Sequence, residues 1–229
     1  METIGLFGGT FDPIHLGHLR AAAEVRRLAR LDRILFIPSY IPPHKTAGGA
    51  ALAADRLRLV ELACRRRAGF EVSPIEVEAR GTSYSILTLR RIRALYPGAR
   101  LFFIAGIDAF LDIGTWHEYE KVLAQCLFLV TGRPGFDLER ARGVLGGRLR
   151  GTIGPLAGAG SLGGPAPPRF RIILVPIRAL DVSSTDVRAR ARRGASLEGL
   201  VPRAVAAYIR ERQIYRGRKE PCPKRRKSA

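Results

Sequence analysis

The sequence predicts an α/β fold built on a parallel β-sheet. Two observations support this: short apolar runs bounded by turn residues recur along the chain, and the segments between them carry apolar residues three and four positions apart. Strands that alternate with helices form βαβ units, in which the strands run parallel. In such a sheet the functional residues are expected beyond the carboxyl ends of the strands.

The predicted strands are short runs rich in Ile, Leu, Val and Phe: residues 4–7, 34–38, 70–77, 101–105, 127–130 and 172–175. The predicted helices turn an apolar stripe toward the sheet and basic residues toward water: residues 16–29, 53–67, 85–95, 118–124, 138–145, 185–191 and 202–212. Residues 143–169 break this alternation because they are rich in Gly and Pro. They predict a long mobile loop between the fifth and sixth strands.

The length and composition predict one globular domain. A chain of 229 residues with 46% hydrophobic residues can bury a substantial core, so we expect a single domain over residues 1–215 with the loop of residues 143–169 inserted in it. The sequence contains neither a membrane-spanning apolar run nor a secretory signal pattern, which predicts a cytoplasmic protein. Cys64, Cys126 and Cys222 lack disulfide or zinc-ligand spacing and are expected to be reduced.

The formal net charge of +19 suggests a nucleic-acid partner, because clustered Lys and Arg release counterions from a phosphate backbone. The distribution of the charge argues against specific nucleic-acid binding. Seven basic residues lie in segment 216–229, which we expect to be a disordered tail, and the others are spread along the chain. A cleft for an anionic small substrate fits the same charge, so a basic nucleic-acid-binding protein is the remoter alternative.

The amino-terminal stretch GLFGGTFDPIHLGHL combines a glycine-rich turn with two histidines. Gly8, Gly9 and Thr10 follow the first predicted strand, where small residues let a phosphate approach the backbone amides. The stretch matches neither the GxxxxGK[ST] phosphate loop nor the GxGxxG dinucleotide fingerprint. His15 and His18 are three residues apart at the start of the next helix, so both imidazoles can hydrogen-bond to one phosphate chain.

Packing or helix capping is the competing interpretation of either histidine taken alone. A metal site is a further alternative, but no third Cys, His or carboxylate ligand lies at a useful spacing nearby. The presence of two histidines within one glycine-rich turn favours the phosphate-binding interpretation.

Two motifs carry a resemblance to a known superfamily. The segment GGTFDPIHLGH at residues 8–18 resembles the signature of the nucleotidyltransferases that carry a (T/H)xGH motif. The segment SSTDVR at residues 183–188 resembles their second signature, (I/V)SST-x-(I/V)R, which lies near the carboxyl terminus. The resemblance implies a Rossmann-like, doubly wound parallel sheet of the nucleotidyltransferase type.

A third stretch, FIAGIDAFLDIGTWH at residues 103–117, resembles the (I/V)xGxDxxxxxxxW stretch of bacterial nicotinate mononucleotide adenylyltransferases. Further loops match that family in order: PPHK at 42–45, SYSILTL at 83–89 and TGRPG at 131–135. The resemblance implies an enzyme of NAD biosynthesis that transfers AMP from ATP to nicotinate mononucleotide, giving nicotinate adenine dinucleotide and pyrophosphate. The nearest alternative is phosphopantetheine adenylyltransferase or another nucleotidyltransferase of the same superfamily.

The resemblance also implies a role for each residue that matches the motifs. The expected ATP-binding residues are Gly8, Gly9, Thr10, Phe11, His15, His18, Gly106, Asp108, Ser184, Thr185 and Arg188. Among these, the expected catalytic residues are His15, His18 and Arg188. The expected nicotinate mononucleotide-binding residues are Lys45, Tyr84, Thr88, Trp116 and Arg133. Mg²⁺ is expected to arrive with ATP rather than at a metal site of the protein. ATP and nicotinate mononucleotide are the expected partners. We expect no membrane partner and no specific nucleic acid, and the sequence leaves the possibility of a homo-oligomer open.

Several of these residues also have plainer interpretations when each is taken alone. SSTDVR is typical of a helix N-cap, and so is an Asp that follows an apolar strand, as Asp108 does. Trp116 can belong to the core, and an isolated cation such as Lys45 or Arg133 is commonly solvated. The order in which the motifs occur favours the nucleotide-binding interpretation.

Overall fold

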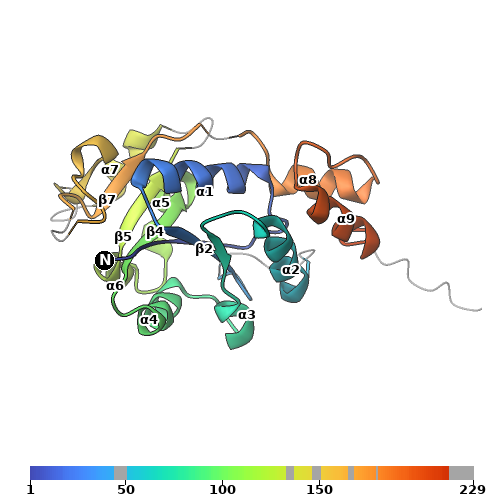
Figure 1. Cartoon of the computed structure of the whole chain (residues 1–229), viewed down its shortest axis with the longest axis horizontal. Helices are drawn as coiled ribbons and strands as arrows, with labels where there is room; N and C mark the ends of the chain where they lie inside the picture. The colour runs from blue at the N-terminus through green and yellow to red at the C-terminus, as the bar shows by residue number, and fades with distance from the viewer. Residues whose placement is uncertain (44–50, 133–136, 146–150, 165–167, 179, 217–229) are drawn as a thin grey trace, which may run out of the picture.

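A parallel β-sheet with the strand order β3-β2-β1-β4-β5-β7-β6 forms the centre of the molecule (Figure 1). The computed structural model describes residues 1–43, 51–132, 137–145, 151–164, 168–178 and 180–216. Every adjacent pair of strands is parallel, and the strands are β1 (Thr3–Gly9), β2 (Arg33–Pro38), β3 (Phe70–Val72), β4 (Arg100–Gly106), β5 (Leu127–Thr131), β6 (Ile153–Pro155) and β7 (Ile172–Val175). The strand order reverses between β1 and β4, which confirms the predicted Rossmann-like, doubly wound sheet.

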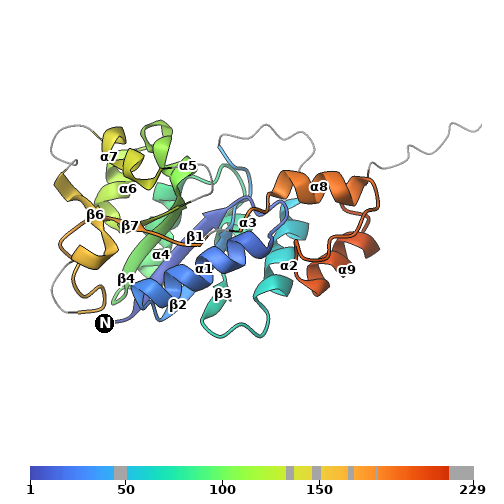
Figure 2. The ribbon, with the colours of Figure 1, turned by 90° about the horizontal axis from the view of Figure 1, so that it is seen from above.

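Helices cover both faces of the sheet. They are α1 (Leu16–Ala29), α2 (Ala53–Cys64), α3 (Ile75–Ala79), α4 (Ser85–Leu95), α5 (Ile107–Leu111), α6 (Tyr119–Gln125), α7 (Ala141–Val144), α8 (Ser184–Arg192) and α9 (Arg203–Glu211), with short 3₁₀ turns at Ile113–Thr115, Leu138–Arg140 and Leu156–Gly158. Figures 1 and 2 show α8 and α9 together at one end of the molecule, beside α2 and away from β7. No helix in the described ranges is long and apolar enough to cross a membrane.

Alternate residues of each strand enter two separate hydrophobic cores, as the pleat of a strand requires. On β2, Ile34 and Phe36 pack with α1 and α2 in one core, whereas Leu35 and Ile37 pack with α4 and α6 in the other. The sheet is therefore buried on both faces, which explains why its strands appear in the sequence as continuous apolar runs.

One predicted strand, residues 70–77, is wrong in its second half. Strand β3 ends at Val72, and helix α3 begins at Ile75 with Pro74 as its N-cap. Proline has no backbone N–H to donate to a neighbouring strand, so Pro74 ends the pairing. The prediction also omitted α5, because this five-residue helix is too short for a periodic pattern to be visible.

The Gly- and Pro-rich segment 143–169 is more ordered than predicted where the structure describes it. It contributes β6, which pairs with β7 at the edge of the sheet. Arg142 donates to the Ile153 carbonyl at 2.9 Å, and Arg100 donates to the Leu162 carbonyl at 2.7 Å. The prediction of one long loop is therefore wrong for the residues of β6, because a strand of three residues shows no alternation in the sequence. Residues 146–150, 165–167 and 217–229 lie outside the described residues.

The two cysteines in the described residues are buried free thiols. Cys64 lies in α2, and Cys126 follows α6. Burial raises the pKa of each thiol to about 12, so neither forms a reactive thiolate near neutral pH. Cys222 lies in the part of the chain that the structure does not describe.

A pair of leucines on α4 tests how this helix packs against the sheet. Leu89 is 1% exposed, whereas Leu95, at the end of the same helix, is 61% exposed. We expect Leu89→Ala to lower the free energy of unfolding by about 2–5 kcal/mol, because it leaves a cavity in the core. The matched control Leu95→Ala should change it by about 0.5 kcal/mol or less. Urea denaturation measures both, and similar losses in the two variants would contradict the described packing.

Candidate active site

A cavity of about 600 Å³ opens beyond the carboxyl ends of β1, β2 and β4. This is the edge of the sheet where the sequence predicted the functional residues. The predicted residues that line the cavity are Gly8, Gly9, Thr10, Tyr84, Thr88, Gly106 and Trp116. Segments far apart in the sequence therefore share one hollow, whereas the other predicted residues that the structure describes are not among those that line it: Phe11, His15, His18, Asp108, Ser184, Thr185 and Arg188.

The two motif histidines lie at the start of α1. His15 is the N-cap residue and is buried, and its backbone N–H donates to Nδ1 of His18 at 3.3 Å. The two imidazole rings are stacked, with centroids 3.7 Å apart and planes 25° apart. The ring of Phe11 meets that of His18 edge-on at 5.2 Å. Stacking and capping thus hold both imidazoles on one side of the helix start, beside the glycine-rich turn.

Gly17 is a residue of this motif that the sequence-based assignment missed. A Cβ atom at this position would lie 3.0 Å from Nδ1 of His15 and 3.4 Å from the backbone oxygen of Leu180. Both distances are at or below ordinary van der Waals contact, so a side chain here would displace the imidazole or the neighbouring chain. The glycine between the two histidines in HLGH was the signal available in the sequence.

The second motif contacts the first directly. The Ser184 hydroxyl donates to the Pro13 carbonyl at 3.0 Å, and the Arg188 guanidinium donates to the Asp12 carbonyl at 2.7 Å. Arg188 also donates to the Thr185 hydroxyl at 3.1 Å. These contacts bring the start of α8 against the loop between β1 and α1. Two helix amino termini, each with a positive dipole end, therefore lie beside the same turn.

The plainer interpretation of SSTDVR is correct for its first residue. The Ser183 hydroxyl accepts a hydrogen bond from the Asp186 N–H at 3.0 Å, which makes it the N-cap of α8. The next serine faces the amino-terminal loop instead, through the contact of Ser184 with Pro13. One motif thus supplies both a helix cap and an interface.

Asp12 organises the loop, although the sequence assigned it no role. Its Oδ1 atom accepts hydrogen bonds from the Ala51 N–H at 3.0 Å and from the Tyr215 hydroxyl at 2.8 Å. Oδ2 lies 3.8 Å from the Arg188 guanidinium. Burial raises the pKa of the Tyr215 hydroxyl, and the charge of Asp12 raises it further, so this tyrosine remains a donor.

Arg56 is a second residue that the sequence did not reveal. It is 2% exposed and donates to three backbone carbonyls, those of Ala51 at 3.1 Å, Thr10 at 2.7 Å and Tyr40 at 2.8 Å. Burial lowers the pKa of its guanidinium. Its planar fork of donors suits three fixed acceptors. Among many arginines in helical segments, no local signal distinguished this one.

At the end of β4, the carboxylate of Asp108 lies close to the backbone of Gly106. Gly106 is the N-cap of α5, and Asp108 lies in the first turn of that helix. A Cβ atom on Gly106 would lie only 2.6 Å from Oδ1 of Asp108. The glycine therefore leaves room for the carboxylate of Asp108 itself, in addition to any ligand.

Aromatic side chains form the opposite wall of the cavity. The ring of Trp116 meets that of Phe103 edge-on with centroids 5.5 Å apart, and Trp116 is only half-buried. The Tyr84 ring lies 4.5 Å from that of His117. His117 and the buried Ser39 also line the cavity, and the sequence-based assignment missed both. The Ser39 hydroxyl has no hydrogen-bond partner within the described residues.

Two of the predicted ligand-binding positions lie outside the described residues, and the side chains of two others contact the protein itself. Lys45 and Arg133 lie outside the residues that the structure describes. The Thr88 hydroxyl lines the cavity but donates to a carboxylate oxygen of Glu76 at 2.5 Å. Phe11 is 3% exposed, so its ring belongs to the core and only its backbone can face a ligand.

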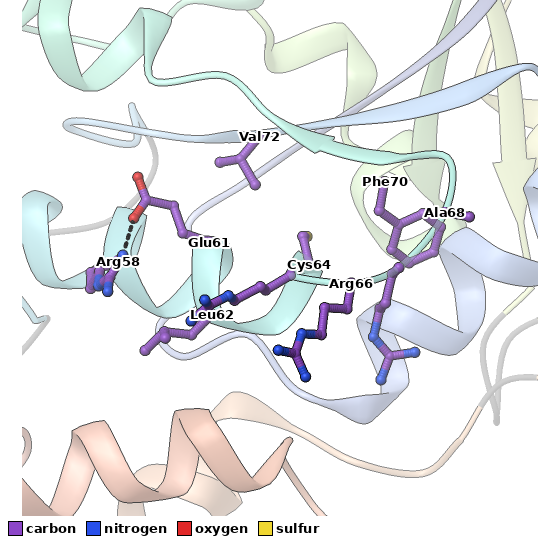
Figure 3. Close-up of a pocket in the computed structure, with 10 residues that line it drawn as sticks. Arg58, Glu61, Leu62, Cys64, Arg66, Ala68, Phe70 and Val72 are labelled. Carbon is purple, nitrogen blue, oxygen red and sulfur yellow. Dashed lines mark hydrogen bonds and ion pairs between the residues drawn. The ribbon is translucent and has the colours of Figure 1, made fainter.

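Basic side chains also gather away from this site. A second hollow, of about 830 Å³, lies between α2 and β3 and is lined by Arg58, Glu61, Leu62, Cys64, Arg65, Arg66, Arg67, Ala68, Phe70 and Val72 (Figure 3). Arg58 pairs with Glu61 at 2.8 Å. None of the motif residues lines this hollow. Positive charge alone therefore does not mark the candidate active site.

Comparison with known proteins identifies the family. A model of the cytidylyltransferase-like family matches residues 6–190. A protein of Pelobacter propionicus named "Probable nicotinate-nucleotide adenylyltransferase" is 41% identical over 220 residues, which cover 96% of this chain and 99% of the relative. A protein of the same name from Geobacter sulfurreducens is 39% identical over 92% of this chain and 97% of its own. The chain belongs to the nicotinate-nucleotide adenylyltransferase family.

Solved structures show the same fold. Plasmodium falciparum nicotinic acid mononucleotide adenylyltransferase complexed with NaAD matches with a TM-score of 0.69 and 16% identity, over 94% of this chain and 98% of that one. The same enzyme complexed with APC matches with a TM-score of 0.67 over the same shares. The resemblance to the adenylyltransferase family that the motifs indicated is thus confirmed for sequence and for fold.

The contact between Tyr215 and Asp12 can be tested in this adenylyltransferase through Tyr215→Phe. We expect the free energy of unfolding to fall by about 1.5–3 kcal/mol at neutral pH, the range for a hydrogen bond to a charged group. Because the folded state raises the pKa of Tyr215 above its ordinary value of 10.0, the contribution of the hydroxyl is complete below that pH and declines as the pH rises above it. Urea unfolding of both proteins between about pH 7 and pH 11 measures this. A difference that stays constant across that range would contradict it.

Proposed function

We propose that this chain transfers AMP from ATP to nicotinate mononucleotide, giving nicotinate adenine dinucleotide and pyrophosphate in NAD biosynthesis. The observation that carries the proposal is the direct contact of the two motifs, Ser184 with Pro13 and Arg188 with Asp12, beside a cavity lined by Trp116. Relatives about 40% identical over nearly the whole chain bear the name of this activity. A neighbour with the same fold is named as a complex with NaAD.

In this proposal, the turn after β1 and the start of α8 bind the triphosphate of ATP. Gly8, Gly9, Thr10 and the backbone of Phe11 offer amides to the phosphates, and His15 and His18 donate hydrogen bonds from the other side. Ser184, Thr185 and Arg188 add hydroxyls, a helix amino terminus and a guanidinium. Gly106 and Asp108 receive the adenosine ribose, whose hydroxyls can donate to the carboxylate.

The reaction needs no covalent intermediate with the protein. A phosphate oxygen of nicotinate mononucleotide attacks the α-phosphorus of ATP in line, a new P–O bond forms, and the bond from the α-phosphorus to the bridging oxygen breaks. Pyrophosphate leaves with the electron pair of that bond. The protein then contributes position and charge stabilisation, and donors held rigidly beside the α-phosphate act most strongly in the transition state. His15, His18 and Arg188 are the proposed donors.

The aromatic wall of the cavity receives the acceptor. Trp116 is half-buried and presents a ring to the hollow, which suits stacking on the nicotinate ring. Tyr84 and Thr88 line the same wall, and we assign them to the mononucleotide. Lys45 and Arg133 remain proposed cations for its 5′-phosphate. We also propose that the backbone amides at the start of α6 receive the nicotinate carboxylate, because N–H groups and a helix dipole favour a negative charge.

We assign Mg²⁺ to the ATP complex rather than to a site built by the protein. In the described ranges, no three His, Cys, Asp or Glu side chains gather where they could hold a metal ion. The ion would then enter with the phosphates and neutralise their charge during transfer. We also propose a cytoplasmic location, which suits the buried free thiols of Cys64 and Cys126.

A comparison of acceptors tests the proposed function. The purified protein with Mg·ATP is expected to release pyrophosphate with nicotinate mononucleotide, more slowly with nicotinamide mononucleotide, and not with phosphopantetheine. Coupled detection of pyrophosphate and chromatography of the dinucleotide measure the products. Turnover with phosphopantetheine alone would favour the other adenylyltransferase, and no pyrophosphate with any pyridine mononucleotide would end the proposal.

The assigned role of His18 makes a separate prediction. His18→Ala should lower kcat by about 10²–10³-fold, which is the usual cost of losing one transition-state donor, and leave the KM for ATP nearly unchanged. Arg65→Ala, in the hollow between α2 and β3, is the control for a polar side chain truncated outside the site. Turnover of the His18 variant close to that of the wild type would reject the role.

A further inference from the structure

We propose that Glu76 is a positioning residue for the acceptor: its carboxylate accepts a hydrogen bond from the Thr88 hydroxyl and so fixes the start of α4 against the cavity. This inference rests on the proposed function, because it concerns the wall assigned to nicotinate mononucleotide. Neither the motifs nor the comparisons assign Glu76 a role. It lies on the short helix α3, in the segment that the sequence mispredicted as strand.

The contact with Thr88 is short and enclosed. The Thr88 hydroxyl donates to Oε1 of Glu76 at 2.5 Å and lies 3.3 Å from the Tyr84 carbonyl. Thr88 is 5% exposed, and both Thr88 and Glu76 line the cavity. A hydrogen bond to a carboxylate in an enclosed setting is stronger and more directional than one between neutral groups. Glu76 therefore ties the first turn of α4 to α3.

A second hydroxyl lies in the same wall. Ser83 lines the cavity with Glu76, and its side-chain oxygen accepts from the Tyr40 N–H at 2.8 Å. The Tyr40 carbonyl in turn accepts from the buried guanidinium of Arg56 at 2.8 Å. Hydrogen bonds thus connect α2, through the loop after β2, to the segment just before α4, and the bond from Thr88 to Glu76 connects α4 to α3.

The electrostatic setting shows why a packing role does not account for this residue. Burial raises the pKa of Glu76, while Thr88, Ser83 and the cations Arg91 and Arg56 favour its ionised form. An apolar side chain of similar size would fill the same space without the cost of burying a carboxylate. The carboxylate supplies a charged acceptor for the Thr88 hydroxyl, which belongs to the wall assigned to the acceptor.

Loss of the Glu76 contact should weaken the binding of the acceptor rather than that of ATP. Helices α3 and α4 lie on the opposite side of the sheet from α1, which carries His18 (Figure 1). Tyr84, immediately before α4, lies against His117 on the side of the cavity that holds Trp116. Loosening the start of α4 therefore disturbs the acceptor wall and leaves the histidine turn in place.

The test uses Glu76→Leu, Glu76→Gln and Thr88→Val, with Glu78→Gln as a matched control on an exposed position of the same helix. Pyrophosphate release gives kcat and the KM of each substrate. We expect Glu76→Leu to raise the KM for nicotinate mononucleotide about tenfold or more, which is the size of one lost charged hydrogen bond. The KM for ATP should stay within about twofold of the wild type, and Glu76→Gln, which keeps one acceptor oxygen, should recover part of the loss.

A double variant separates positioning from a general loss of structure. Glu76→Leu combined with Thr88→Val should raise the acceptor KM no further than the worse single variant, because both remove the same contact. An unchanged acceptor KM, or an equal rise in both KM values, in Glu76→Leu overturns the inference. If that variant does not fold, Glu76→Gln decides it by the same criterion. A wild type without activity toward nicotinate mononucleotide overturns the proposed function itself, and this inference with it.

Discussion

The structure depends on one contact between segments that lie far apart in the chain, the docking of α8 on the loop between β1 and α1. Arg188 and Ser184 donate to the backbone carbonyls of Asp12 and Pro13, and the Asp12 side chain accepts from Tyr215. The start of α1 joins the same interface, since the Leu16 N–H donates to the Leu200 carbonyl at 2.8 Å. Because the contacts are to backbone atoms, they specify the path of the loop and with it the position of both histidines.

The carboxyl-terminal helices α8 and α9 therefore help to form the candidate site. Besides the contacts at Asp12, the Tyr208 hydroxyl on α9 donates to Asp55 on α2 at 2.9 Å. Polar contacts of this kind are directional and hold one arrangement, while Val205 and Ile209 are buried and add apolar contact. The two helix starts that face the glycine-rich turn are thus positioned by the packing of α9 as well as by their own sequence.

Arg56 joins the two halves of the candidate site. Its guanidinium donates to the Thr10 carbonyl in the turn assigned to ATP and to the Tyr40 carbonyl beside the wall assigned to the acceptor. A buried cation with fixed acceptors resists rearrangement, because breaking any of its bonds leaves a polar group unpaired away from water. Arg56 therefore connects the turn assigned to ATP with the segment beside the wall assigned to the acceptor. In-line transfer requires a fixed spacing between the two substrates.

The sequence by itself determined the fold class, most of the strands and helices, the family, and the residues of the two motifs, because each of these rests on local patterns. An apolar run that is buried on both faces of a sheet is visible in the sequence without knowledge of its partners. It did not predict β6, α3 or α5, which are too short to show a period, nor the roles of Asp12, Arg56 and Glu76. Only the tertiary structure decided those, because each acts on groups distant in sequence: Asp12 on Tyr215, Arg56 on Thr10 and Tyr40, and Glu76 on Thr88. The role of a buried charged residue depends on its hydrogen-bond partners in the folded protein, and a local sequence pattern does not predict those partners.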